Sequence, residues 1–442
     1  MSSVGAASGP LLSSSCSTAS VVSDPSDGST SEFWTLMNLL RAMIGFGVMT
    51  LPSAFNRIGF YLAVAMLLLC LVLTVRCCNK LLVVAAQLRR ESRLAQLDYG
   101  KAMQKAFALY GPRSVAHRSP VVLYATNAML VGMQVGVGAL YYKFVAENTM
   151  KMVSMSWPGL GWPQPAYMAL FFVPLLLLLC VRSPTTIGKW ASLTNALLFC
   201  AFACLLATLA MGRHSVDRLT TINPYFWESV IGVGNIVGAF EIQGVVVSIG
   251  NQVRRPQAML GFTGIVGTGC YVSAMLYIAI GLLGVATYGD KVQASITLNL
   301  YNGWLSNALV CAFCAALFVA YAVQLMPIMD IVDSAIDTRV SSQPCRRLTR
   351  VGARLLIVAT TAAIAVVVPR LDQLHSLIFS TAGCVISVAL PALSHLAVFR
   401  GQLNWLGKLE DVGLALGGLV YLVIGTVGNV KEVLDSWEEA AG

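Results

Sequence analysis

Glu241 is the residue of this sequence whose type and position are most suggestive of chemistry. It is the only Asp or Glu near the middle of any apolar segment long enough to cross a bilayer. An ionisable side chain at that depth costs at least ~2.5 kcal/mol and usually has a function. Glu241 could exchange a proton or balance a cationic substrate. The structural alternative is a carboxylate that pairs with Arg41 or is held by backbone N–H groups.

Two clusters of helix-breaking residues also suggest a site. The first is Ile44-Gly45-Phe46-Gly47, followed by Pro52. In the second, Phe240 and Glu241 lie among Gly232, Gly234, Gly238, Gly244 and Gly250. In a bilayer, a broken helix is tolerated where its free backbone groups line a cavity. Helix N-termini attract a carboxylate and C-termini an ammonium, so a zwitterionic amino acid fits such a site. Alternatively, these glycines only allow close helix packing.

Neutral polar residues in other apolar segments are further candidates. Gln134, Tyr321 and Gln324 could face a cavity, although hydrogen bonds between helices are the commoner role of such groups. His375 and His395 could relay protons, with a neutral, hydrogen-bonded histidine as the alternative. The sequence has no Gly-rich phosphate loop, Ser-His-Asp arrangement or metal-ligand cluster. It therefore predicts no enzyme, no cofactor and no metal site.

The composition of the chain places these residues in a membrane. Hydrophobic residues make up 57% of the 442 and charged residues 11%, unlike a soluble domain. A spanning helix needs about 20 mostly apolar residues, and the chain has eleven such segments. Their approximate bounds are 33–56, 58–87, 119–147, 165–182, 189–212, 228–250, 258–288, 303–337, 353–369, 374–399 and 409–430. The sequence thus predicts an all-α, multi-pass integral membrane protein in contact with the lipid bilayer.

Lys and Arg are distributed unevenly between the loops. With the N-terminus inside, inner loops hold eighteen of the 29, outer loops eight, and spans three. Cytoplasmic loops carry the excess in membrane proteins, so the pattern predicts a cytosolic N-terminus and an external C-terminus. The net charge of +9 is therefore attributed to membrane orientation, and no nucleic-acid partner is predicted.

The segments outside the spans are short. Residues 1–32 hold twelve Ser and no Lys or Arg, which predicts a disordered, Ser-rich cytosolic tail. Residues 431–442 are predicted to form a short external tail. The loop 88–118 has apolar residues at helical spacing among Lys and Arg. It is predicted to be an amphipathic helix on the cytosolic face, with a solvated helix packed on the bundle equally allowed.

The two helix-breaking clusters fall in the first members of two successive groups of five spans. This placement predicts a five-plus-five inverted repeat with broken first and sixth helices, inside a transmembrane domain at 33–430. The first repeat covers about 33–212 and the second about 228–399, with an extra helix at about 409–430.

Four segments, in order, resemble the amino acid/auxin permease family of transmembrane amino acid transporters. The first is "NLLRAMIGFGVMTLPSAFNRIG" and the sixth span holds "GAFEIQGVVVSIGNQVRRP". The eighth span holds "YAVQLMPIMDIV" and the tenth "GCVISVALPALSHL". The matching positions of the first two are Asn38, Leu39, Gly45, Gly47, Leu51, Pro52, Ala54, Phe55, Gly59, Ala239, Phe240, Glu241, Gly244, Val245, Val246, Asn251 and Pro256.

The resemblance implies eleven spans, an inverted repeat, and substrate binding at the breaks of the first and sixth spans. Carried over by position, it implies that Gly45, Gly47, Phe240 and Glu241 lie at the site. Phe46 departs from the family, where a small residue is usual, so the pocket size is open. The wider fold has a sodium site that needs hydroxyls from the eighth span. Residues 308–330 contain no Ser or Thr, so sodium-independent transport is predicted.

The predicted function is secondary active or facilitative transport of amino acids, with protons as the coupling ion and Glu241 as the coupling residue. One alternative is a carrier of basic amino acids or polyamines, with Glu241 as the counter-charge. Another is a sensor that binds an amino acid without transport, although such a protein is expected to have a longer tail with recognisable motifs. The sequence fits either the plasma membrane or a vacuolar or lysosomal membrane.

Overall fold

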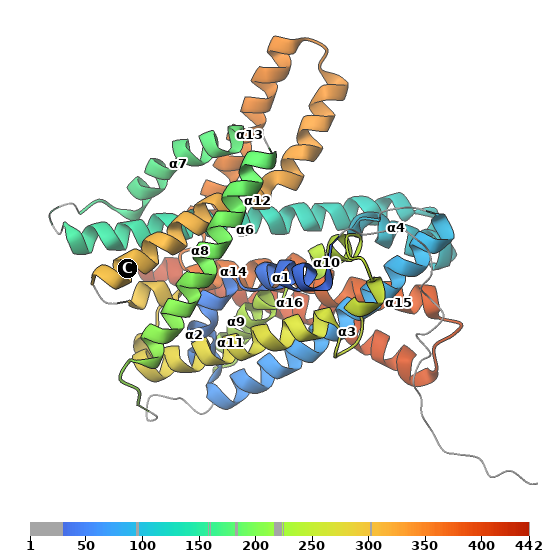
Figure 1. Ribbon diagram of the computed structural model, residues 1–442, viewed down its shortest axis with the longest axis horizontal. Coiled ribbons are helices and arrows are strands. Elements are labelled where there is room, and N and C mark those ends of the chain that lie inside the picture. Colours follow the sequence, from blue (N-terminus) through green and yellow to red (C-terminus); the bar gives the residue numbers. More distant parts are fainter. Residues whose placement is uncertain are drawn as a thin grey trace, which may run out of the picture.

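The computed structural model describes residues 30–93, 97–157, 159, 161–181, 184–215, 223, 225–300 and 303–441. Within this part of the chain, the regular structure is helical apart from one isolated bridge between Thr30 and Val253. Figure 1 shows the helices gathered into one bundle, with a hairpin of α12 and α13 projecting from it. The prediction of an all-α fold is confirmed.

The helices of the bundle follow the predicted segments closely. They are α1 (Glu32–Met43), α2 (Gly47–Ile58), α3 (Phe60–Ser92), α4 (Tyr99–Tyr110), α5 (Arg113–His117), α6 (Ser119–Ser156), α7 (Gln164–Cys180), α8 (Pro184–Ala210), α9 (Phe226–Ala239), α10 (Gln243–Gly250), α11 (Ile265–Tyr288), α12 (Trp304–Arg339), α13 (Gln343–Val367), α14 (Leu371–Ile378), α15 (Leu390–Phe399) and α16 (Trp405–Ala441). Two π-helical turns, Phe379–Gly383 and Val385–Ala389, connect α14 to α15.

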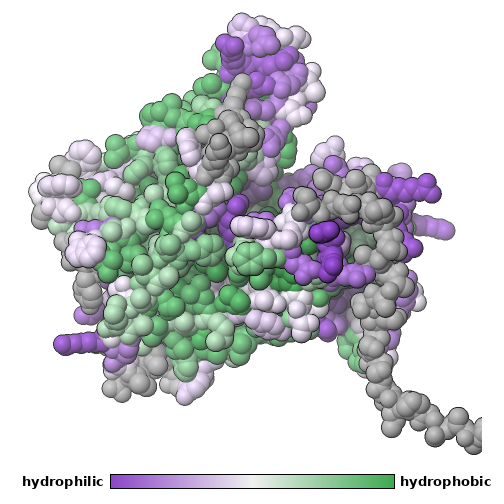
Figure 2. Space-filling model, in the orientation of Figure 1, coloured by the Kyte–Doolittle hydropathy of each residue, from purple (hydrophilic) through white to green (hydrophobic). Residues whose placement is uncertain are grey.

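The spans can be recognised by length and hydropathy. Within the described residues, nine helical segments are long and apolar enough to cross a membrane, and the bent pair of α1 and α2 makes a tenth. Helix α7 is apolar but shorter, at 17 residues. Together these segments coincide with the eleven predicted from the sequence. Figure 2 shows a largely hydrophobic surface, with hydrophilic side chains gathered around α4 and at the α12–α13 hairpin.

Both predicted helix breaks are present. In the first span, α1 ends at Met43 and α2 begins at Gly47, and the two axes differ by 52°. In the sixth span, α9 ends at Ala239 and α10 begins at Gln243. Each break is therefore three residues long and falls within the cluster that the sequence singled out.

The packing of the helices agrees with an inverted repeat. If α1 and α2 correspond to α9 and α10, then α3 corresponds to α11, α6 to α12, and α8 to the α14–α15 span. Helix α11 packs against α1 and α2, and α3 packs against α9 and α10 in the same way. Likewise α12 packs against α8, and α6 packs against α14. Helix α16 lies outside this scheme, against α9 and α15.

The bundle has two distinct polar ends. At one, called here the α4 end, the Thr30 N–H donates to the Gln252 carbonyl at 3.1 Å, and the Asn251 side chain donates to the Leu97 carbonyl at 2.9 Å. The other is called here the Arg57 end. There Arg57, near the end of α2, donates a hydrogen bond to Glu432 of α16 at 3.2 Å. Figure 1 shows α4 and the C-terminus on opposite sides of the bundle.

Helix α4 is packed on the bundle. Its residues Tyr99, Ala102, Met103 and Ala106 are buried, and the helix contacts α6 and α15. The Tyr99 hydroxyl donates to the carbonyl of Ile386 in the π-helical part of the tenth span, at 2.6 Å. Of the two alternatives for residues 88–118, the structure favours a helix packed on the bundle.

Some boundaries differ from the prediction because polar residues extend apolar helices. Helix α6 continues to Ser156 and α13 starts at Gln343, ten residues before the predicted bound of 353. Helix α16 continues through 431–441, which the sequence suggested as a tail. The tail predicted for 1–32 lies almost entirely outside the described residues, since the description starts at Thr30.

Candidate functional site

A cavity of about 490 Å³ lies beside both helix breaks. It is bounded by α1, α6, α8, α10 and α12. Of the nine residues predicted from the sequence to bind the substrate, five line it: Ile44, Gly45, Gln134, Glu241 and Gln324. These residues come from the first, third, sixth and eighth spans, so the fold brings together side chains that are up to 280 positions apart in the chain.

The other four predicted residues lie next to the cavity without lining it. Phe240 is buried, with its ring 5.0 Å from that of Tyr277. Tyr321 is also buried, and its hydroxyl is hydrogen-bonded to that of Thr361 at 2.9 Å. Gly47 and Phe46 face neighbouring helices, as described below.

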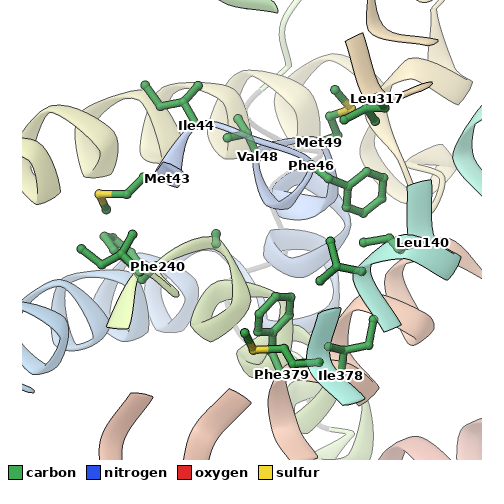
Figure 3. Close-up of a cluster of buried hydrophobic side chains, with 14 of the residues drawn as sticks. Met43, Ile44, Phe46, Val48, Met49, Leu140, Phe240, Leu317, Ile378 and Phe379 are labelled. Carbon is green, nitrogen blue, oxygen red and sulfur yellow. The ribbon is translucent and has the colours of Figure 1, made fainter. Parts of the chain in front are cut away.

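Phe46 belongs to an apolar layer on the Arg57 side of the breaks. Its ring centroid lies 5.6 Å from that of Phe144 and 5.6 Å from that of His375. Figure 3 shows Phe46 beside Leu140, in a cluster that includes Phe379. The ring therefore lies outside the cavity walls, and the pocket size that the sequence left open is not reduced by Phe46.

The two glycines of the first break have different surroundings. A Cβ atom at Gly47 would lie 2.8 Å from the Cα of Ala239, at the end of α9. Gly47 thus allows the first and sixth spans to approach closely. A Cβ atom at Gly45 would meet none of the described heavy atoms within 4 Å, because this residue faces the cavity. Of the two interpretations made from the sequence, close helix packing applies to Gly47, and a break that lines a cavity applies to Gly45.

The sixth break is capped by side chains. The Gly244 N–H donates to Oε1 of Glu241 at 3.0 Å, and the Ile242 N–H donates to Oε1 of Gln243 at 2.9 Å. Glu241 is partly buried and lines the cavity. Within the described residues it forms no ion pair with Arg41, so of the two structural alternatives only the contact with a backbone N–H is present. The capping glutamine Gln243 was missed from the sequence.

Tyr277 of α11 connects the two breaks. Its hydroxyl lies 2.8 Å from the carbonyl oxygen of Met43 and 2.7 Å from that of Ala239. With one proton it donates to either carbonyl or is shared between them. A tyrosine in the middle of an apolar segment gave no sign of this role in the sequence, because the role depends on which spans are neighbours.

The Arg57 end is closed by charged side chains. Arg57 and Asp372 are 5% and 0% exposed, and Nε of Arg57 donates to Oδ2 of Asp372 at 2.9 Å. Arg57 also pairs with Glu228, and with Glu432 at 3.2 Å. Ser53 donates to Asp372 at 2.7 Å. This network joins α2, α9, α14 and α16 above the apolar layer of Phe46.

The two histidines considered from the sequence are hydrogen-bonded between helices. Nδ1 of His375 lies 2.9 Å from Oδ1 of Asn235 in α9. His395 lies at the α4 end, where its Nδ1 is 2.8 Å from Oδ2 of the buried Asp411, which also pairs with Lys80 at 2.6 Å. Neither histidine lines the cavity.

The sequence matches a known family over most of its length. Residues 28–430 match the family described as transmembrane amino acid transporter protein. The chain belongs to this family. The resemblance found from its four motifs is thereby confirmed, and the protein is a multi-pass membrane transporter by family and not an enzyme.

Relatives of this transporter have low sequence identity to it, but the similarity covers most of the chain. A Drosophila melanogaster protein named proton-coupled amino acid transporter-like protein pathetic is 23% identical, covering 92% of this chain and 86% of the relative. The Arabidopsis thaliana amino acid transporter AVT3C is 24% identical, covering 91% of each chain. The crystal structure of MhsT in complex with L-phenylalanine has a TM-score of 0.50 at 12% identity, covering 92% of this chain and all of MhsT. That likeness shows a shared fold.

The eighth span of this transporter lines the cavity without a hydroxyl group. Helix α12 contributes the lining residues Ala316, Leu317, Ala320, Val323, Gln324 and Pro327. Apart from the amide of Gln324, these side chains carry no oxygen. A hard cation such as Na⁺ needs several oxygen ligands, and this wall of the cavity offers few.

Proposed function

We propose that this protein is a proton-coupled, sodium-independent transporter that binds an amino acid in the cavity beside its two helix breaks. The observation that carries the proposal is the position of Glu241. Its carboxylate caps the broken sixth span and at the same time lines the cavity. A group so placed can respond to a substrate and to a proton together.

The relatives support an amino acid as the substrate. Family members are described as transmembrane amino acid transporters, and two similar proteins are named as transporters of amino acids, one of them proton-coupled. The cavity also suits this ligand, since broken helices present N–H groups to a carboxylate and C=O groups to an ammonium. We infer that Ile44, Gly45 and Glu241 contact the backbone atoms of the amino acid, while Gln134 and Gln324 contact its side chain.

The closed Arg57 end supports a transport cycle of alternating access. In the observed state, the apolar layer of Phe46 and the Arg57 network lie between the breaks and one side of the membrane. The cavity instead extends toward Asn38 and Gln252, at the α4 end. In the predicted orientation this is the cytosolic side, and we infer from it a state whose proposed substrate site faces the cytosol.

Uptake into proteoliposomes across a pH series tests the role of Glu241. In the wild type, we expect uptake of radiolabelled amino acids to rise when an inward proton gradient is imposed. Glu241→Gln keeps the size of the side chain and an acceptor for the Gly244 N–H, so the break should remain folded. Its uptake should no longer depend on pH, because the group that exchanges the proton is gone.

The matched control for this experiment is Glu410→Gln. Glu410 is 32% exposed, pairs with Arg76 and Lys80, and lies outside the cavity. This variant should keep the pH profile of the wild type. If Glu241→Gln also keeps it, with unchanged substrate preference, Glu241 has only a structural role and the coupling proposal is wrong.

Sodium independence is tested by ion replacement. Replacing Na⁺ with choline at fixed pH should leave uptake unchanged, because the eighth span supplies no hydroxyl ligand to the cavity. A strict loss of uptake in choline would refute sodium independence without affecting the assignment of amino acids as substrates.

A further inference from the structure

The cavity contains two charged side chains of opposite sign. Arg41 and Glu241 both line it, and every other lining residue is neutral at pH 7. The neutral polar members are Asn38, Gln134, Tyr141, Thr194, Asn195, Gln252 and Gln324. The electrostatic preference of the cavity therefore depends on Arg41 and on the protonation of Glu241.

Arg41 makes no ion pair within the described part of the chain. Its side chain is exposed and lies in the last turn of α1, where the helix dipole favours a cation. Many other arginines of the bundle do pair with carboxylates: Arg57, Arg76, Arg346, Arg350, Arg354 and Arg370. An unpaired cation inside a span is costly and usually serves a ligand.

Arg41 lies close to the proposed substrate. It precedes Ile44 by three residues, which is about 4.5 Å along a helix axis. Arg41 lies on the side of Ile44 that faces the α4 end, and the cavity extends toward that end. An amino acid that moves between the breaks and the α4 end therefore passes the Arg41 guanidinium.

We propose that Arg41 makes the cavity selective against cationic substrates, so that basic amino acids and polyamines are excluded. The inference rests on the proposed function and specifies its substrate class: amino acids whose net charge is zero or negative.

Charge balance gives the reason. When Glu241 is ionised, the cavity is neutral and a zwitterion with an uncharged side chain adds no net charge. When Glu241 is protonated, Arg41 is the remaining charge, and it accepts a zwitterion or an acidic side chain. A lysine, arginine or spermidine molecule adds an uncompensated positive charge in both states, next to the guanidinium of Arg41, and like charges at short distance repel each other.

Uptake of individual radiolabelled compounds into proteoliposomes tests this inference. The compounds are leucine, glutamine, glutamate, lysine and spermidine, each measured at two pH values. The wild type should take up at least one of the first three and reject lysine and spermidine. Arg41→Gln should raise uptake of lysine, relative to whichever of the first three compounds the wild type takes up best, by about tenfold, the change expected when one nearby like charge is removed. Arg41→Lys, which keeps the charge, should retain the wild-type preference.

Arg255→Gln is the matched control, because Arg255 is 79% exposed, pairs with Glu32 and lies outside the cavity. It should leave the preference unchanged. If Arg41→Gln does not fold, the wild type still provides a test, since the compound among the first three that it takes up best should raise its midpoint of thermal unfolding, and lysine should not.

The outcomes distinguish this inference from the proposed function. Among leucine, glutamine and glutamate, the one that the wild type takes up best is the reference compound. Wild-type uptake of lysine equal to that of the reference compound overturns the role of Arg41 and leaves amino acid transport standing. So does an unchanged preference in a folded Arg41→Gln variant. Absence of uptake and of stabilisation for all five compounds contradicts the proposed function itself.

Discussion

The two ends of the bundle use charged residues in opposite ways. At the Arg57 end, Arg57 meets the carboxylates of Glu228, Asp372 and Glu432 and is almost fully buried. In the cavity beside the breaks, Arg41 and Glu241 form no ion pair with each other or with other described residues. One region satisfies its charges internally, and the other keeps them available.

The difference shows how charge inside a membrane protein can be interpreted. A buried ion network that is fully paired joins helices and becomes costly when one partner is removed. Charges that line a cavity without an ion-pair partner do not join helices in this way, and they can change partners during a transport cycle. The presence or absence of an ion pair therefore distinguishes two groups of charged residues: those that close the Arg57 end, and those that we propose act on the substrate. Ion pairs depend on the tertiary structure, so this distinction cannot be made from the sequence.

The largest effect that we predict in this comparison is the loss of Arg57. In Arg57→Gln, three carboxylates lose their shared cation, and the completely buried Asp372 keeps the ion pair with the more exposed Arg370 at 3.2 Å. Breaking a buried pair in this way costs about 3–5 kcal/mol. The midpoint of thermal unfolding in detergent, measured by size-exclusion chromatography after heating, should fall strongly. The amount of folded protein should also decrease.

Arg76→Gln is the control at an exposed pair. Arg76 is 47% exposed and pairs with Glu410 at 2.9 Å. Such a pair contributes about 0–1 kcal/mol, so its loss should hardly change the unfolding midpoint. Equal midpoints for the two variants would show that burial of the Arg57 network does not contribute to stability.

The sequence was sufficient to locate the spans and both breaks. Long apolar segments and glycine clusters are local signals, because a spanning helix needs about 20 apolar residues and makes its backbone hydrogen bonds within its own segment. The position of Glu241 at mid-span was also a local signal, and it led to a residue that lines the cavity.

The partners of these residues could not be predicted in the same way. Arg57 and Asp372 are 315 positions apart, and Tyr277 contacts a residue 234 positions away. No spacing rule connects such pairs, because their contact depends on how the spans are arranged around the breaks. From the sequence, Arg57 is one of the eight outer-loop cations and has no visible partner. The effect of Phe46 on the pocket size is also open from the sequence, and only the fold shows that its ring packs against Phe144.

A second prediction compares two glycines of the first break. In Gly47→Ala, the new methyl group would meet the backbone of Ala239, which has no flexible end that could move away. Such overpacking costs roughly 1–3 kcal/mol. Gly45→Ala adds the same methyl group to the open cavity, so it should preserve the unfolding midpoint and mainly change the KM of uptake.

The measurements for this pair are the unfolding midpoint and the KM of amino acid uptake. We expect Gly47→Ala to lower the midpoint and Gly45→Ala to alter the KM. The reverse pattern would contradict the assignment of Gly47 to helix packing and of Gly45 to the cavity.

The smallest effect concerns Tyr277, whose hydroxyl connects the two helix breaks. Tyr277→Phe removes the hydroxyl that is shared by the carbonyls of Met43 and Ala239. The expected cost is about 1–2 kcal/mol, since Met43 keeps a hydrogen bond from the Gly45 N–H at 3.0 Å. Because the shared hydroxyl links the two breaks, uptake should fall by more than this loss of stability explains.

Tyr421→Phe is the control: its hydroxyl donates to the Val230 carbonyl of α9 at 2.9 Å, away from the breaks. If both variants lose the same stability and the same uptake per folded molecule, Tyr277 serves only as one more buried hydrogen bond.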